Sequence, residues 1–194
     1  MFDSGISVKN LVEELQNEVD IALDIPNATY ITWLNSLQQL LYTEIIKEQK
    51  KAVLSDISAS PVSISSIGDE NTRFEDIYAV YANGKQLIKS TVTSGVIFPD
   101  TFYKDNNDLG FNTNPKPTEL TVVYIVKPAM VKDGDKSTVA IPIEFIDLVK
   151  AKLRGEAYKL ANEGDLSAMW LNDYNTLLET FKAWISEKAP IFGM

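Results

Sequence analysis

The chain contains no cysteine and no histidine among its 194 residues. Without cysteine there can be no disulfide framework, no thiolate zinc site and no cysteine nucleophile. Without histidine the chain lacks the usual general base near neutral pH and the commonest metal ligand. Catalysis could still use paired carboxylates, lysine, or serine with lysine. The composition therefore favours a protein that is not an enzyme, with no catalytic, cofactor-binding or metal-binding residue to assign.

An excess of basic residues is also missing, because 18 Lys and Arg stand against 27 Asp and Glu and give a formal net charge of -9. Wrapping DNA or lying on an anionic membrane needs surplus positive charge at the contact, so this balance argues against both. No apolar run approaches the roughly 18 residues of a membrane span. The first residues, MFDSGISVKNLVEEL, lack the basic and apolar regions of a signal peptide. We therefore expect a soluble protein that is made in a cytoplasm.

Two amphipathic helices are predicted at the start of the chain. From Val8 onward the apolar residues recur every three or four positions, with Ser7 placed as the N-cap of the first helix. The second helix continues the same spacing to about Lys50, with Asn27 or Thr29 placed to cap its start. Each apolar stripe needs another element against which it can be buried.

The middle of the chain changes to short apolar runs separated by Ser, Thr, Gly, Asn and Pro, which indicates strands joined by turns. Asn83-Gly84 separates Ile77–Ala82 from Gln86–Thr91 and tolerates the positive φ angles of a tight turn, which predicts a β-hairpin. The strongest predicted strand is LTVVYIV, residues 120–126, whose lack of alternation predicts burial on both faces.

Two further predictions concern the flanks of this hairpin. Val62, Ile64 and Ile67 are assigned to one candidate strand. The polar, turn-rich residues 100–117 are expected to form an exposed loop.

The last segment returns to a helical pattern. Ile141-Pro142 begins one predicted helix, and residues 162–164 end it. Asp165 or Ser167 then caps another helix, whose apolar stripe is Trp170, Tyr174, Leu177, Phe181 and either Trp184 or Ile185. The final residues, KAPIFGM, are expected to be an apolar tail with no helical continuation.

Together these elements predict an α+β fold. Residues 1–52 and 141–187 form a mainly α-helical bundle, with two N-terminal and two C-terminal helices. Residues 53–140 form an inserted β-rich module, and residues 188–194 form the C-terminal tail.

Two acidic segments superficially match calcium loops. Asp105, Asn107 and Gly110 occupy the first, third and sixth positions of that pattern, but Leu109 and Lys116 stand where oxygen ligands are required. A solvated loop is therefore the better interpretation of the first segment. The second, residues 133–135 with the sequence DGD, is interpreted as a tight turn.

Three stretches carry a resemblance to a known family: IYAVYANGKQLI, ELTVVYIVKPAMV and AIPIEFIDLVKAKLRGEAYKLANEGDLSAMWLNDYNTLLETFKAWI. With two helices before the β-rich insertion, this layout resembles the head-to-tail connector or adaptor proteins of tailed bacteriophages. In that family a Pro-initiated helix ends in a small acidic turn and is followed by a long amphipathic helix. The resemblance covers most of the chain as a layout and transfers no individual functional residue.

The resemblance implies a structural role in the virion. Adaptors of this family form a homo-oligomeric ring, commonly dodecameric, below the portal protein in the head-tail neck. The ring extends the DNA channel and presents a surface to tail or stopper proteins, and DNA passes through it without specific binding. It would be assembled from chains made in the host bacterial cytoplasm. An acidic chain fits a channel through which DNA must slide.

Candidate partner-binding residues lie at two places. Apolar residues at or beyond the end of the last predicted helix are Trp184, Ile185, Pro190, Ile191 and Phe192. The predicted turn at Asn83 and Gly84 is the second place. The tail could instead fold back onto the helices or be frayed. Two alternative functions remain open: another structural or assembly protein of the phage tail or neck, or a carboxylate-dependent hydrolase.

Overall fold

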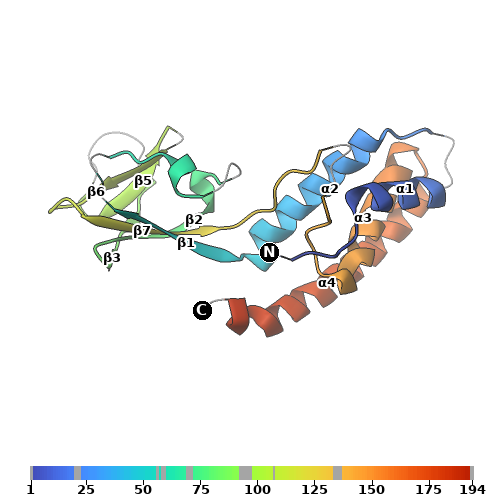
Figure 1. Cartoon of the computed structure of the whole chain (residues 1–194). Coiled ribbons are helices and arrows are strands. Elements are labelled where there is room, and N and C mark those ends of the chain that lie inside the picture. The colour runs from blue at the N-terminus through green and yellow to red at the C-terminus, as the bar shows by residue number, and fades with distance from the viewer. Residues whose placement is uncertain are drawn as a thin grey trace. The chain divides into compact units, whose positions relative to one another are not determined.

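The computed structural model describes residues 2–19, 23–55, 57, 60–68, 72–91, 98–106, 108–132 and 137–192, with only the backbone for residues 189–192. The described residues form four α-helices and two β-sheets (Figure 1). The chain divides into two compact units. The helical unit comprises residues 1–46 and 128–194, and the β unit comprises residues 47–127. The sequence had placed these boundaries later, after residues 52 and 140.

The part of the helical unit that the structure describes contains four α-helices and two shorter turns of helix. These are α1 (Val8–Glu18), α2 (Asn27–Leu41), the π-helical turn η1 (Tyr42–Ile46), the 3-10 turn η4 (Ile143–Phe145), α3 (Ile146–Leu160) and α4 (Gly164–Phe192). The predicted cap of α1 is confirmed, because the Ser7 hydroxyl accepts a hydrogen bond from the backbone N–H of Asn10 at 3.2 Å. The predicted cap of α2 is wrong: Pro26 precedes the helix, and no side chain caps it.

Helices α3 and α4 pack closely, and small residues permit the approach. A Cβ atom at Gly155 would lie 2.8 Å from the side chain of Leu171, so a larger residue would push the two helices apart. The buried Ser167 hydroxyl donates a hydrogen bond to the Gly155 carbonyl at 2.9 Å. Ser167 therefore links the two helices instead of capping α4, which begins earlier, at Gly164.

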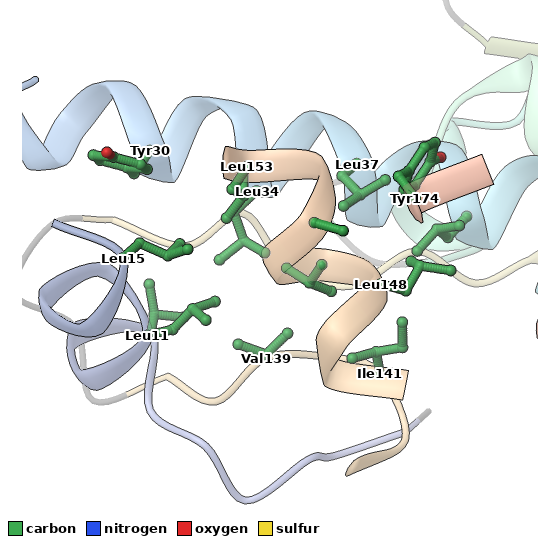
Figure 2. Close-up of a cluster of buried hydrophobic side chains, with 14 of the residues drawn as sticks. Leu11, Leu15, Tyr30, Leu34, Leu37, Val139, Ile141, Leu148, Leu153 and Tyr174 are labelled. Carbon is green, nitrogen blue, oxygen red and sulfur yellow. The ribbon is translucent and has the colours of Figure 1, made fainter. Parts of the chain in front are cut away.

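The core of the helical unit collects apolar side chains from all four helices (Figure 2). Members that Figure 2 labels are Leu11 and Leu15 of α1, Leu34 and Leu37 of α2, Leu148 and Leu153 of α3, and Tyr174 of α4. Val139 and Ile141, which precede η4, are fully buried in the same core. Residues near position 139 thus belong to the helical unit, and their prediction as part of the β-rich module is wrong.

Amide side chains of α2 form hydrogen bonds with backbone groups of the segment that begins at Pro128 and leads into η4. The Gln38 carbonyl oxygen accepts from the Ala140 N–H at 2.6 Å, and the Gln39 amide donates to the Pro128 carbonyl at 2.8 Å. A segment without regular structure can lie against a helical core only when its backbone polar groups find partners. These amides supply the partners, which explains why the unit boundary falls at residue 128.

Helix α4 is longer than the sequence predicted. It contains 29 residues and continues through Pro190 to Phe192, so the prediction of a non-helical tail from residue 188 is wrong. The φ angle that proline imposes is itself helical. Pro190 therefore removes one hydrogen-bond donor without requiring the helix to end there.

The described residues of the β unit form seven strands in two sheets. The four-stranded sheet has the order β1-β7-β2-β3, with β1 (Gln49–Ser55), β7 (Glu119–Ile125), β2 (Ile77–Ala82) and β3 (Lys85–Gln86), all antiparallel. The three-stranded sheet has the order β4-β5-β6, with β4 (Ile88–Lys89), β5 (Thr101–Asp105) and β6 (Asp108–Asn112). In the second sheet β4 and β5 run parallel, and β5 and β6 run antiparallel. Two 3-10 turns, η2 (Ile64–Ser66) and η3 (Phe74–Asp76), precede β2.

The hairpin predicted at Asn83-Gly84 is confirmed. Strands β2 and β3 are joined by these two residues, whose φ angles are 47° and 81°. Both angles lie in the left-handed region that the tight hairpin turn requires. The strand expected at residues 120–126 is also present as β7, between β1 and β2.

Three predictions for the β unit are wrong. The second helix was expected to reach Lys50, but η1 ends at Ile46 and Lys47 has a φ angle of 49°, which a right-handed helix cannot accommodate. The next residues form β1. Ile64 lies in a 3-10 turn and not in a strand.

The third wrong prediction is the exposed loop over residues 100–117. This stretch contains the hairpin of β5 and β6, whose Phe102, Leu109 and Phe111 are buried in the core of the β unit. Polar and turn-forming residues surround these three apolar residues in the sequence, so the stretch lacks the alternating pattern by which a strand is predicted. Of the calcium-like segment, Asp105 ends β5 and Gly110 lies in β6, whereas Asn107 and the DGD segment lie outside the described residues.

Candidate interaction surface

The predicted turn residues are engaged within the β unit. The Asn83 side-chain oxygen accepts three hydrogen bonds, from the Thr118 N–H at 3.1 Å, the Thr118 hydroxyl at 3.0 Å and the Glu119 N–H at 3.0 Å. This side chain therefore ties the turn to the start of β7. At Gly84 an added Cβ would meet no atom within 4 Å, so the turn is open on that side.

The candidate residues near the C-terminus are placed differently. Trp184 is half-buried, with its ring centroid 5.3 Å from that of Phe145 and 5.8 Å from that of Phe2, and Ile185 is only 6% exposed. Both therefore pack into the core of their own unit and are not available as an exposed apolar surface. The side chains of residues 190–192 lie outside the described part of the structure.

A groove in the β unit provides a better candidate surface. It has a volume of about 440 Å³ and is lined by Tyr78, Gln86, Leu87, Ile88, Lys89 and Phe102. Leu87 and Phe102 are buried, and they form an apolar floor. Tyr78 and Ile88 stand at the rim with 65% and 70% of their surface exposed. Large apolar side chains at such exposure mark an interaction site when they gather in one place.

Local backbone irregularities place these side chains. The pairing of β2 with β7 shifts register between Ile77 and Ala79, at Tyr78. A bulge of this kind redirects a side chain out of the regular alternation. On the opposite wall the chain changes sheets at Leu87 and Ile88. The Leu87 N–H donates to the Val80 carbonyl at 2.8 Å, and the Ile88 N–H donates to the Asp100 carbonyl at 2.9 Å.

One charged residue, Lys89, lines the groove, and further ion pairs lie elsewhere in the β unit. The Lys89 ammonium lies 5.0 Å from the ring centroid of Phe74, within the range of a cation–π contact. Near this ring, Lys104 donates a hydrogen bond to Glu75 at 2.6 Å and thereby lowers the pKa of that carboxyl group. Lys85, the first residue of β3, and Asp100, which precedes β5, form an ion pair at 2.5 Å.

The lining of the groove combines apolar and polar side chains. Its side chains offer apolar contact, one phenol hydroxyl, one amide and one ammonium group. Such a surface would accept an apolar side chain flanked by an acidic one. Within the described residues, no group of three or more acidic side chains could hold a metal ion, and no helix is long and apolar enough to cross a membrane.

Sequence reasoning did not single out Tyr78 or Ile88. Both belong to predicted strands, where an apolar residue is ordinarily assigned to the core. The available signal was IYAVYA, in which Ile77 and Tyr81 alternate with Tyr78 and Val80, so that bulky side chains point to both faces of the strand and only one face can line a given core. Tyr78 and Ile88 are exposed because of the register shift at Tyr78 and the change of sheet at Leu87. Both features depend on pairing between residues far apart in the sequence.

Comparison with known proteins adds no relative. No protein-family model matches the chain, and a search of curated proteins gives no significant match.

Proposed function

We propose that this chain is a structural protein of a bacteriophage virion, a head-to-tail adaptor that forms a ring below the portal. In this proposal the fold is a helical bundle with an inserted β-rich module, and the ring extends the DNA channel and joins the head to the tail. The observation that carries the proposal is the groove between Tyr78 and Ile88, because it offers a concave apolar surface for another protein. The family resemblance of the sequence supplies the identity of the assembly.

The charge distribution supports this role. The helical unit has nine Lys and Arg residues against 17 Asp and Glu, a net charge of -8. The β unit has nine Lys and Arg residues against ten Asp and Glu, a net charge of -1. A nearly neutral surface suits protein contacts because it avoids mutual repulsion between copies, whereas an acidic surface suits a channel that must not retain DNA phosphates.

The test is assembly with portal. Purified chain would be mixed with portal rings of the same phage and examined by electron microscopy and analytical ultracentrifugation. A ring of the chain attached to one face of the portal is expected. The Tyr78→Ser/Ile88→Ser variant should lose the ring, whereas the control Leu160→Ser, at a site 49% exposed in the helical unit, should retain it.

Two outcomes would contradict the proposal. A chain that stays monomeric at every concentration, with and without portal, would exclude an adaptor. Rings that bind tail proteins and never portal would assign the chain to the tail.

A further inference from the structure

Within the described part of the β unit, strand β1 has one backbone edge with no strand paired to it. Residues of an antiparallel strand direct their N–H and C=O groups alternately toward one neighbour and away from it. The Val126 N–H donates to the Glu48 carbonyl at 2.8 Å, which identifies Glu48 as a residue that faces β7. In steps of two, Lys50, Ala52 and Leu54 also face β7. The residues that direct their backbone groups away from β7 are therefore Gln49, Lys51, Val53 and Ser55.

The other side of β7 gives an independent check of this assignment. The Asn83 N–H donates to the Glu119 carbonyl at 3.0 Å, so the odd-numbered residues of β7 face β2. Its even-numbered residues must then face β1, as the first assignment requires. Within the described residues, β7 is the only strand that pairs with β1.

Of the other edge strands in the described part of the β unit, β6 is covered by the chain itself, and β3 and β4 contain only two residues each. Along β6, Leu109 exchanges two backbone hydrogen bonds with Val62, at 2.8 and 2.9 Å, and the Phe111 N–H donates to the Ser60 hydroxyl at 3.0 Å. Strand β3 leads directly into β4, which pairs with β5. Among the described strands, β1 is thus the long edge that remains available.

The side chains of β1 divide into a basic half and a neutral half. Lys50 and Lys51 are exposed, and no ion pair in the described part of the chain involves them. Ala52, Val53 and Leu54 follow, with Val53 62% exposed. Lysine on an edge strand discourages pairing with a like-charged strand. It does not discourage an acidic one, because opposite charges across paired strands attract.

We propose that β1 is a strand-addition site for an extended segment of a partner protein. The segment pairs antiparallel to β1, with two consecutive acidic residues opposite Lys50 and Lys51 and β-branched residues opposite the neutral half. Backbone hydrogen bonds supply the affinity, and the acidic pair fixes register and direction. A second copy of β1 is the poorer occupant, because self-pairing would bring four lysines into one short ribbon. The inference does not rest on the ring assembly proposed above.

The first experiment uses the full chain and a capped heptapeptide, Thr-Val-Thr-Val-Glu-Glu-Thr, followed by amide hydrogen exchange in NMR. Bound peptide should protect the amides of Lys51 and Val53, which face away from β7. Protection of the Ala52 and Leu54 amides, already bonded to β7, should not change. A peptide with both glutamates replaced by lysine should bind about tenfold more weakly, because two attractive cross-strand pairs become repulsive.

A proline variant separates strand addition from side-chain docking. Proline is tolerated on an edge strand where its missing N–H would face solvent. Val53→Pro should therefore keep the Ala52 and Leu54 amides protected and abolish peptide binding. Val53→Thr, the matched control, should bind normally. Lys50→Glu/Lys51→Glu should reverse the preference between the two peptides.

Three results would overturn the proposal. The Lys51 and Val53 amides could remain unprotected at millimolar peptide. Val53→Pro could bind as well as the unaltered chain, which would show docking of side chains only. Protection of the same two amides could increase with protein concentration in the absence of peptide, which would show that a second copy occupies the edge.

Discussion

The side-chain amide of Asn35 forms two hydrogen bonds with the backbone of Val131. The Val131 N–H donates to the Asn35 carbonyl oxygen at 2.8 Å, and the Asn35 amide donates to the Val131 carbonyl at 2.9 Å. Asn35 is buried in α2, and Val131 lies 96 positions away in the chain. One amide thus gives both backbone groups of a buried residue the partners that a neighbouring strand would supply.

Asn35→Leu should destabilise the helical unit by about 2–5 kcal/mol, because it leaves a buried donor and a buried acceptor without partners. Urea unfolding followed by circular dichroism would measure the change. Ser36→Ala, on the exposed face of the same helix, is the control and should alter the free energy of unfolding by less than about 0.5 kcal/mol. An equal effect of the two changes would show that the Asn35 contact contributes nothing.

Lys127→Met should destabilise the β unit strongly. The Lys127 ammonium contacts the Asp76 carboxylate at 2.5 Å, and the two side chains are only 13% and 3% exposed. Removing the lysine leaves a buried carboxylate whose remaining hydrogen bond, within the described residues, comes from the Arg73 N–H at 2.9 Å. We expect a loss of about 3–5 kcal/mol in chemical denaturation.

The control for this prediction is Lys104→Met. Lys104 and Glu75 form a more exposed ion pair, so its loss should change the free energy of unfolding by less than about 1 kcal/mol. The double variant Asp76→Leu/Lys127→Met should recover part of the stability, because it removes both buried charges. If Lys127→Met were as stable as the unaltered chain, the prediction would be wrong.

The Glu75 carboxyl group should titrate below its ordinary pKa of 4.5, chiefly because Lys104 donates a hydrogen bond to the ionised form. A pKa that is lower in the folded chain stabilises the fold above the unfolded pKa, and this contribution is lost as the pH falls through the folded value. Carboxyl carbon shifts measured by NMR would report the pKa. Lys104→Met should raise it toward 4.5. An unchanged value would exclude Lys104 as the cause.

Gly84→Ala should destabilise the β unit by about 1–2 kcal/mol, because the φ angle of 81° disfavours a residue with a Cβ atom. Space is not the obstacle, since nothing lies within 4 Å of the added carbon. Gly164→Ala is the matched control: it also has open space, and it begins α4 without a positive φ. It should be neutral or stabilising. Calorimetry would measure the unfolding temperature of each variant. Equal changes in Gly84→Ala and Gly164→Ala would contradict the assignment to backbone strain.

Local sequence patterns determined the elements whose formation depends on near neighbours. Ser7 caps α1 because its hydroxyl reaches an N–H three residues ahead. Asn83 and Gly84 form the hairpin turn because their backbones tolerate positive φ. The run at β7 is apolar enough to form a strand between two others. In each case the decisive interaction spans only a few residues or follows from side-chain type.

The remaining features were decided by contacts between residues far apart in the sequence. In the sequence, Asn35 is an ordinary polar residue of a predicted helix. Its role depends on the segment containing Val131, which packs against it in the fold. The β5–β6 hairpin was concealed because its aromatic residues become a core only when β2 and β7 cover them. The exposure of Tyr78 depends on a register shift against β7, and the free edge of β1 depends on which strands find partners elsewhere. A pattern of residue types cannot contain this information, because hydrophobicity shows that a side chain needs burial but not which neighbour will provide it.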